Sequence, residues 1–423
     1  MRRIQELSRD ERREIIERSV SVDSVVEDAE EIIEDVRRRG DEALVDLTRE
    51  YDGVELDSVR VGEDRLESAV DRLEPEVLDA VETAAERVRR FHEKQVRDGW
   101  SVEEDGVEVG RRFFPLESAG AYVPGGEADY PSTALMTVIP ARIAGVKDVV
   151  AVTPPEAGDA TLAALKIAGV DEVYEVGGAH AVGALAYGTR TVEKVDSVVG
   201  PGNVYVTAAK KVVRERGDAR IEFPAGPSEI GVVADGSANP EYVAVDMLAQ
   251  TEHDTDAHAV LATTSEELAE DVEEEFESRI PRMEREEIAR EARRDVVVGS
   301  LDDCVGFMHE YAPEHLSVVA EDEEKEERIL EGVRKAGSVF LGSMTPVAAG
   351  DYVTGTNHVL PTGGGARLYG GLSVDDFVRG VTVQRTTLNG LERLGGTVTT
   401  LARTEGLDEH ARSVEVRTRD GEE

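Results

Sequence analysis

The chain has 423 residues, of which 40% are hydrophobic, so it can bury a large core divided among roughly two to four domains. Its formal net charge is −42, from 48 basic and 90 acidic residues, and a field of this sign repels nucleic acids and anionic membranes. The single cysteine excludes a disulfide framework and a thiolate zinc cluster, so a metal would need histidine, carboxylate or amide ligands.

The same composition predicts where the protein works. The acidic excess indicates a host with a salt-rich cytoplasm, because at about 1 M salt the Debye length falls to about 3 Å and like charges stop repelling one another across the surface. The segment 1–19 is charged and has a helical pattern, and no apolar run reaches about 18 residues. We therefore expect a cytoplasmic, halophilic protein with no nucleic-acid or membrane partner.

The first part of the chain, residues 1–100, has mostly helical periodicity, which is strongest over 25–51 and 75–94. From residue 118 the pattern changes to short apolar runs that alternate with helical stretches. The predicted strands cover 119–124, 148–155, 171–178 and 194–200, and the predicted helices cover 131–145, 160–169 and 180–189. Strand, helix and strand at this spacing indicate a parallel sheet.

A second run of the same kind begins near residue 229 and predicts a second α/β unit in tandem with the first. Its predicted strands cover 229–235, 257–264, 295–300, 315–320 and 337–342, and its predicted helices cover 240–253 and 265–279. A glycine-rich region over 345–371 follows, and then the terminal helices. An irregular segment of this length inside a compact protein is often functional.

Glu314 and His315 stand immediately before an apolar, β-branched run, in the stretch APEHL. The run predicts a buried strand, which places both side chains at a strand terminus, where ligands collect in α/β sheets. Histidine titrates near neutrality and can relay protons, and a partly desolvated glutamate has a raised pKa and can activate water. A structural ion pair explains the same residues equally well.

Other histidines lie close to further potential ligands. Gln250 and His253 are three residues apart at the end of a predicted helix, a spacing that places both on one face. They can bind a metal, or His253 can be a helix-end histidine satisfied by a carbonyl. Asp351 and His358 lie on either side of Gly355 in the irregular region, either as site residues or as parts of a surface loop.

Glu405 and His410 form another candidate pair near the C-terminus. They are separated by about 140° around a helix, so an uninterrupted helix would not bring them to one face. Gly406 offers a break between them. A solvated helix end is the alternative interpretation.

Three glycine-containing stretches follow predicted strands: YVPGG at 122–126, VGGAHAVG at 176–183 and GPGN at 200–203. Free main-chain amides at such strand-to-helix junctions can hold phosphate. No G-x-G-x-x-G follows a strand, and tight turns account for the glycines equally well. These stretches alone do not assign a dinucleotide.

Taken together and in order, the motifs resemble one family, the zinc- and NAD-dependent histidinol dehydrogenases. The resemblance covers about residues 20–417 and rests on YVPGG, PARIAG, GPGNVYVTAAK, AGPSEI, AQTEH, APEHL, GDYVTGTNHVLPT and GLDEHARSVEVR. It implies two successive oxidations, from L-histidinol through L-histidinaldehyde to L-histidine, with two NAD⁺ reduced. It also implies one zinc ion per subunit and a place at the last step of histidine biosynthesis.

The resemblance further implies a role for each matching residue. Glu314 and His315 match the catalytic pair. The implied zinc ligands are Gln250, His253, Asp351 and His410. The implied substrate contacts are Ser228, His358 and Glu405, together with His315 and the four zinc ligands. The implied nucleotide contacts are Tyr122, Asn203 and His180, the last of which replaces the family's usual glutamine.

The family forms an intertwined homodimer with shared active sites, so His410 is expected to reach the metal of the other subunit. Its fold consists of two incomplete Rossmann-like α/β domains with small C-terminal elements. The expected parts are an N-terminal helix at 1–20, a larger discontinuous domain of 21–112 with 229–370, a nucleotide-binding domain at 113–228, and a helical extension for dimerisation at 371–423.

Three other functions fit part of the pattern. A related zinc and NAD dehydrogenase could oxidise another small alcohol, such as a dihydroxypropane sulfonate, although Glu405 and the two zinc histidines suit the imidazole and amine of histidinol better. A zinc hydrolase would use Glu314 as its general base without a nucleotide. A non-catalytic binding protein would leave the retained base and metal ligands without a purpose.

Overall fold

The computed structural model describes residues 1–18, 22–126, 128–223 and 226–419. The chain divides into two compact units, the first formed by Met1–Gln95 with Leu116–Phe377 and the second by Val96–Pro115 with Val378–Glu423. The expected boundary between residues 20 and 21 lies outside the described residues. Within the described ranges, no helix combines the length and the apolar character needed to cross a bilayer.

The first unit contains a five-stranded sheet with the order β6-β5-β4-β7-β8. Its strands are β4 (Ser118–Tyr122), β5 (Asp148–Thr153), β6 (Glu172–Glu175), β7 (Ser197–Val199) and β8 (Arg220–Ile221). The connecting helices are α6 (Pro131–Ala144), α7 (Asp159–Ala168), α8 (Gly178–Tyr187) and α9 (Val204–Arg216). Every pairing in this sheet is parallel, because a helix after each strand returns the chain to the end of the sheet where that strand began. The predicted parallel sheet is confirmed.

Four earlier helices pack against the helices that surround this sheet. They are α2 (Val26–Arg39), α3 (Asp41–Tyr51), α4 (Glu63–Arg72) and α5 (Pro75–His92). Leu44 of α3 is buried in one cluster with Val152 of β5, and Val88 of α5 is buried in another with Val149. The expected grouping of 21–112 with 229–370 differs from this packing. Helical periodicity shows that a helix has an apolar face, but it does not show which sheet that face covers.

The first unit also contains a six-stranded parallel sheet with the order β1-β11-β10-β9-β12-β13. Its strands are β1 (Arg2–Arg3), β9 (Glu229–Ala234), β10 (His258–Thr263), β11 (Arg293–Val298), β12 (His315–Val319) and β13 (Ser338–Leu341). Its helices are α1 (Arg9–Ile16), α10 (Pro240–Thr251), α11 (Glu266–Arg279), α12 (Glu286–Glu291), α13 (Leu301–Tyr311), α14 (Glu323–Gly332) and α15 (Val347–Tyr352). The central strands are buried along their whole length, as expected for a sheet covered on both faces. The strand order reverses between β9 and β12, and the α/β class is confirmed.

Short 3₁₀ helices occupy several connections of the first unit: η1 (Ile4–Glu6), η2 (Glu93–Gln95), η3 (Ile280–Arg282), η4 (Gly365–Arg367) and η5 (Val374–Phe377). The glycine-rich region after residue 345 is therefore less irregular than its composition predicts. It contains α15 and η4, and Asp351 lies on α15.

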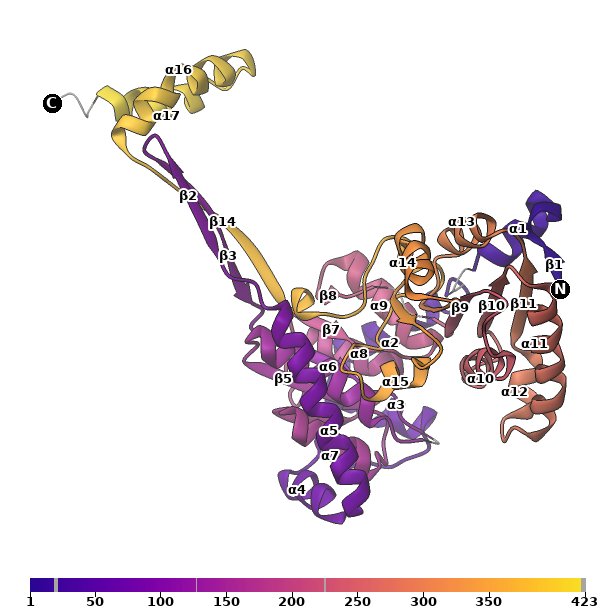
Figure 1. Cartoon of the computed structure of the whole chain (residues 1–423). Coiled ribbons are helices and arrows are strands. Elements are labelled where there is room, and N and C mark those ends of the chain that lie inside the picture. Colours follow the sequence, from indigo (N-terminus) through magenta and orange to yellow (C-terminus); the bar gives the residue numbers. More distant parts are fainter. Residues whose placement is uncertain (19–21, 127, 224–225, 420–423) are drawn as a thin grey trace. The chain divides into compact units, whose positions relative to one another are not determined.

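The second unit consists of a three-stranded antiparallel sheet and two helices. The strands β2 (Trp100–Glu104), β3 (Val107–Pro115) and β14 (Val378–Thr386) pair in the order β14-β3-β2, and α16 (Leu388–Thr404) and α17 (Asp408–Arg419) lie side by side (Figure 1). The sequence predicted the helices but not the sheet. The feature of the sequence that indicates this sheet is the Asp105-Gly106 dipeptide. Both residues have positive φ, and they join β2 to β3 as a tight hairpin turn.

Candidate active site

Glu314 and His315 lie where the chain enters β12. The helix α13 ends at Tyr311, Ala312 adopts a left-handed conformation with φ 54°, and the chain then turns into the sheet beside β9. The two side chains are only 6% and 4% exposed. The predicted strand terminus is confirmed, and it is the amino-terminal end of β12, whereas open α/β sheets usually bind ligands beyond the carboxyl ends of their strands.

The main chain of Glu229, at the start of β9, holds both side chains. Its N–H donates to Oε2 of Glu314 at 2.8 Å, and its carbonyl oxygen lies 3.1 Å from Nδ1 of His315. A carbonyl can only accept, so Nδ1 carries the proton of this hydrogen bond. In the neutral imidazole, the lone pair therefore lies on Nε2.

The surroundings raise the pKa values of both groups. Burial raises the pKa of Glu314 well above its ordinary value. Burial alone would lower the pKa of His315, but the carboxylates of Glu314 and Asp351 outweigh it and raise that pKa. Nε2 of His315 is buried and makes no well-directed hydrogen bond within the described part of the chain, and Oδ1 of Asp351 lies 3.3 Å away. This nitrogen is available to a substrate.

The charges of Asp351, His315 and His253 all act on the pKa of His358. Burial lowers the pKa of His358, the charge of Asp351 raises it, and the neighbouring His315 and His253 lower it again. The ring of His358 also reaches α6, where its Nε2 lies 3.2 Å from the hydroxyl oxygen of Ser132. The loop that carries His358 therefore connects the sheet of Glu314 and His315 with the sheet of the glycine-containing stretches.

Gln250 and His253 lie at the end of α10. Gln250 belongs to the last turn of the helix and is buried, whereas His253 lies beyond the helix end at Thr251 and is exposed. The expectation that one helical face carries both is therefore wrong, because the helix stops between them. The N–H of His253 instead donates to the carbonyl of Gln250 at 3.4 Å, which keeps the two residues close.

The implied metal ligands are divided between the two units. Among the residues that the structure describes, no group of three or more His, Cys, Asp or Glu side chains is arranged for a metal. In the first unit the implied set contributes the imidazole of His253, the carboxylate of Asp351 and the amide of Gln250. Nitrogen and oxygen donors of this kind suit zinc, so the donor chemistry fits the implied metal.

His410 and Glu405 belong to the second unit. Glu405 caps the C-terminal end of α16, His410 lies in α17, and both side chains are exposed. Gly406 has φ 76° and separates the helices, so the predicted break is confirmed. In the first unit, Ser228 directly precedes β9, and its carbonyl accepts the N–H of His258 at 3.1 Å.

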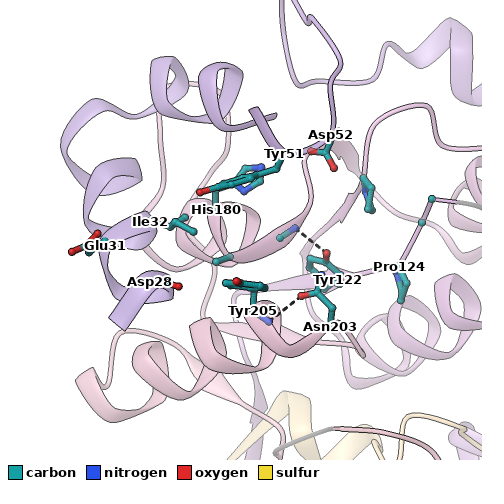
Figure 2. Close-up of a pocket in the computed structure, with 16 residues that line it drawn as sticks. Asp28, Glu31, Ile32, Tyr51, Asp52, Tyr122, Pro124, His180, Asn203 and Tyr205 are labelled. Atoms are coloured by element: carbon teal, nitrogen blue, oxygen red, sulfur yellow. Dashed lines mark hydrogen bonds between the residues drawn. The ribbon is translucent and has the colours of Figure 1, made fainter. Parts of the chain in front are cut away.

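The predicted nucleotide contacts Tyr122, His180 and Asn203 line one cavity of about 590 Å³ (Figure 2). The cavity lies where β4, α8 and the N-terminus of α9 meet, at the glycine-containing stretches. Asp28 of α2 and Tyr51 of α3 complete the wall. Sequence analysis missed these two residues, because nothing local relates helices near the N-terminus to a distant sheet.

Two of these contacts are held by hydrogen bonds to the main chain. The hydroxyl of Tyr122 accepts the N–H of Gly178 at 3.0 Å, and burial raises the pKa of Tyr122 to about 12, so it stays a neutral phenol. The side chain of Asn203 caps α9 and accepts the N–H of Tyr205 at 3.1 Å (Figure 2) and the N–H of Val206 at 3.1 Å. Both residues present fixed polar groups to the cavity.

His180 has no such anchor. It is buried, and burial lowers its pKa to about 4. Neither ring nitrogen has a hydrogen-bond partner within the described ranges, and its nearest aromatic neighbour is Tyr51, with ring centroids 6.2 Å apart (Figure 2). A neutral imidazole in this position can donate one hydrogen bond and accept another from a ligand.

Comparison with known proteins agrees with this geometry and confirms the resemblance seen in the motifs. The family model of histidinol dehydrogenase matches residues 16–418. A histidinol dehydrogenase of Haloarcula marismortui is 50% identical over 99% of both chains, and one of Methanothermobacter thermautotrophicus is 49% identical over 96% of this chain and 97% of its own. The crystal structure of histidinol dehydrogenase from Elizabethkingia anophelis superposes with a TM-score of 0.92 at 37% identity, covering 99% of this chain and 98% of that one. The chain therefore belongs to the histidinol dehydrogenase family.

Proposed function

We propose that this chain oxidises L-histidinol through L-histidinaldehyde to L-histidine, with two NAD⁺ reduced. As a member of its family the chain is an oxidoreductase of histidine biosynthesis. One observation carries the proposed chemistry: the hydrogen bond between Nδ1 of His315 and the carbonyl of Glu229 leaves Nε2 of the neutral ring as a buried proton acceptor, which makes no well-directed hydrogen bond among the described residues and lies 3.3 Å from Oδ1 of Asp351.

His315 and Glu314 divide the proton transfers. In the first oxidation, Nε2 of His315 accepts the hydroxyl proton while hydride passes from carbon to NAD⁺, and the aldehyde results. In the second, Glu314 accepts a proton from water as its oxygen adds to the carbonyl carbon. His315 then accepts a hydroxyl proton of the hydrate while hydride passes from the carbon of the hydrate to a second NAD⁺. The product is the acid. The buried position of Glu314 supports this role, because a raised pKa suits a group that must take up a proton.

We infer one zinc ion per subunit, with Gln250, His253, Asp351 and His410 of the partner subunit as ligands. Zinc bound there would hold the imidazole and amine of the substrate and orient its alcohol carbon. The carboxylate of Glu405 and the side chains of Ser228 and His358 complete the proposed substrate contacts. The position of His358 beside Asp351 and His315 supports its part in this set.

The cavity of Figure 2 is the proposed NAD⁺ site, with Tyr122, His180 and Asn203 as contacts. Two observations support it. The amides at the start of α9 and the neutral ring of His180 are suited to a polar ligand. The cavity is also large enough for part of a dinucleotide, since ligand pockets commonly measure about 300–1,000 Å³.

We propose a homodimer whose interface uses the second unit. Its sheet and helices leave large apolar side chains in water, among them Trp100 at 56%, Val102 at 58% and Leu401 at 58% exposed. Exposed apolar groups gathered in one small unit mark an interaction surface, and we propose that a second copy of the chain covers them. The relative from Haloarcula marismortui and the acidic surface also support a salt-rich cytoplasm as the working environment.

One assay tests the function. Purified protein in concentrated KCl should form NADH when L-histidinol and NAD⁺ are supplied, lose this activity after treatment with a chelator, and regain it when zinc is added. Faster turnover of a dihydroxypropane sulfonate than of histidinol would favour the related dehydrogenase. Absence of NADH with either alcohol would contradict the proposal and leave a hydrolase or a binding protein.

A further inference from the structure

Arg18 and Glu229 form a buried ion pair at the start of β9. Nε and Nη2 of Arg18 donate to the two carboxylate oxygens of Glu229 at 2.8 and 2.9 Å, so the ion pair is bidentate. Both side chains are at least nine-tenths buried. The guanidinium also lies 3.4 Å from the centre of the Tyr311 ring. Oε1 of Glu229 accepts a further hydrogen bond, from the N–H of Gly363 at 2.8 Å.

Arg18 also holds the turn that leads into β12. Its Nη2 donates to the carbonyls of Tyr311 at 2.8 Å and Ala312 at 3.3 Å. Ala312 is a non-glycine residue with φ 54°, a conformation that L residues avoid unless surrounding contacts maintain it. Arg18 supplies two contacts to this turn, which ends two residues before Glu314.

Glu229 connects this ion pair to the reacting groups. Its carboxylate binds Arg18, its N–H binds Glu314, and its carbonyl binds Nδ1 of His315. The main chain of Glu229 therefore holds both side chains of the Glu314–His315 pair in position, and Arg18 holds the side chain of Glu229. A buried ion pair is in general weak evidence for stability, because desolvation of the two charges offsets their attraction, so this one needs another reason to be there.

We propose that Arg18 and Glu229 are positioning residues for Glu314 and His315. The proposal rests on the proposed function of that pair. Both proton transfers require donor and acceptor within hydrogen-bond reach, and a displacement of about 1 Å can cost roughly 100-fold in rate. The ion pair keeps the start of β9 and the turn before β12 in register, so the two acceptors keep their distance and direction.

Two variants test the proposal. Arg18→Lys keeps the charge but replaces the planar guanidinium with an ammonium group, which cannot reproduce the hydrogen bonds to the carboxylate and to both carbonyls. Glu229→Gln keeps the shape but removes the charge. For both we expect kcat to fall about 10- to 100-fold with histidinol and with supplied histidinaldehyde. KM for histidinol and for NAD⁺ should stay within about threefold, since no hydrogen bond between described residues joins Arg18 or the Glu229 side chain to the implied zinc ligands or nucleotide contacts.

Asp235→Asn is the matched control. Asp235 follows the carboxyl end of β9, is also buried, and accepts hydrogen bonds from Nζ of Lys325 at 2.5 Å and from the N–H of Glu321 at 3.2 Å. It therefore joins the same two strands at their opposite ends. If Arg18 and Glu229 only stabilise the sheet, this control should lower kcat as much as they do, and the proposal is overturned. We expect it to keep kcat within about twofold.

A spectroscopic measurement tests the positioning of His315 without an activity assay. With ¹⁵N-histidine labelling, the Nδ1–H of His315 should give a slowly exchanging proton signal in the wild-type protein and in Asp235→Asn, and lose it in Arg18→Lys and Glu229→Gln. Variants that keep both this signal and wild-type kcat overturn the proposal. If the wild type does not oxidise histidinol, the proposed function fails, and the signal still decides the positioning. Circular dichroism in molar KCl checks that each variant is folded, and Arg18→Lys is the milder change should Glu229→Gln unfold.

Discussion

Nε2 of His315 lies 3.3 Å from Oδ1 of Asp351, and this contact joins the start of β12 to the short helix α15. The proposed proton acceptor is therefore adjacent to a proposed metal ligand. A substrate held at the metal would need to reach only one neighbouring nitrogen to lose its proton.

Replacing Glu314 with glutamine should separate the two oxidations. The amide can still accept the N–H of Glu229, but it cannot take a proton from water. We expect oxidation of supplied histidinaldehyde to slow roughly 10²- to 10⁴-fold, whereas the first hydride transfer from histidinol stays within about tenfold. Single-turnover NADH formation from each compound measures this. Glu310→Gln, an exposed glutamate of α13, is the control, and equal losses in both steps would contradict the division of roles.

Mixing two inactive chains should restore activity if sites are shared between subunits. His410→Ala and His253→Ala chains each lack one implied zinc ligand, but a mixed dimer retains one complete site. Random pairing gives half mixed dimers with one of two sites intact, so we expect about a quarter of wild-type activity. Differently tagged chains allow the mixed dimer to be purified. A purified mixed dimer with no activity would rule out the shared site.

Gly200 should not accept a side chain. It has φ 112°, and a Cβ atom there would lie 2.1 Å from the carbonyl oxygen of Tyr122. We expect Gly200→Ala to lower the melting temperature and to weaken NAD⁺ binding at least tenfold, because the stretch that carries Asn203 must move. Calorimetry measures both effects. Gly306→Ala, inside α13 with open space around it, should instead be neutral or stabilise by about 0.5–1 kcal/mol.

Asp235 should give the protein a stability contribution that depends on pH. Burial alone would raise its pKa, but hydrogen bonds from Lys325, Ser237 and the N–H of Glu321 outweigh burial and lower it to about 2. A lowered carboxyl pKa means that the contribution is present above about pH 4 and is lost as the pH falls toward 2.

The free energy of unfolding of Asp235→Asn should therefore lie about 1–2 kcal/mol below that of the wild type from pH 7 to 5, with the gap closing between pH 4 and 2. Denaturant titrations at several pH values measure the gap. Asp302→Asn, at an exposed ion pair, serves as the control and should show no comparable gap. A gap for Asp235→Asn that persists at pH 2 would be inconsistent with the lowered pKa.

High salt should stabilise the protein. On α11, Glu270 and Glu274 are exposed like charges one helical turn apart, and screening weakens such repulsion. We expect the free energy of unfolding to rise between dilute buffer and about 2 M KCl, and to rise less in the double variant Glu270→Gln with Glu274→Gln. Sucrose at matched osmolality is the control for general solute effects. A flat response to KCl would remove the argument for a salt-rich host.

The sequence by itself determined the local features of this protein. Period-2 and period-3.6 patterns located the strands and helices of both parallel sheets, since each pattern depends on which face of one element is buried. Glu314 and His315 were also found in this way, because APEHL places reactive groups next to a strand, whereas the roles of Ser228, Tyr122 and Asn203 came only from the family resemblance. The Gly406 break and the strand terminus at Glu314 were correct for the same reason.

Only the tertiary structure decided what lies next to what. It placed Glu314 and His315 at the amino end of β12, brought Tyr51 to the wall of the cavity that contains Tyr122, His180 and Asn203, and joined Arg18 to Glu229. It also assigned the helices of 26–92 to the five-stranded sheet and paired β14 with β3. These contacts join residues far apart in the chain, and no local pattern encodes them, because each depends on which surfaces meet when the whole core is buried.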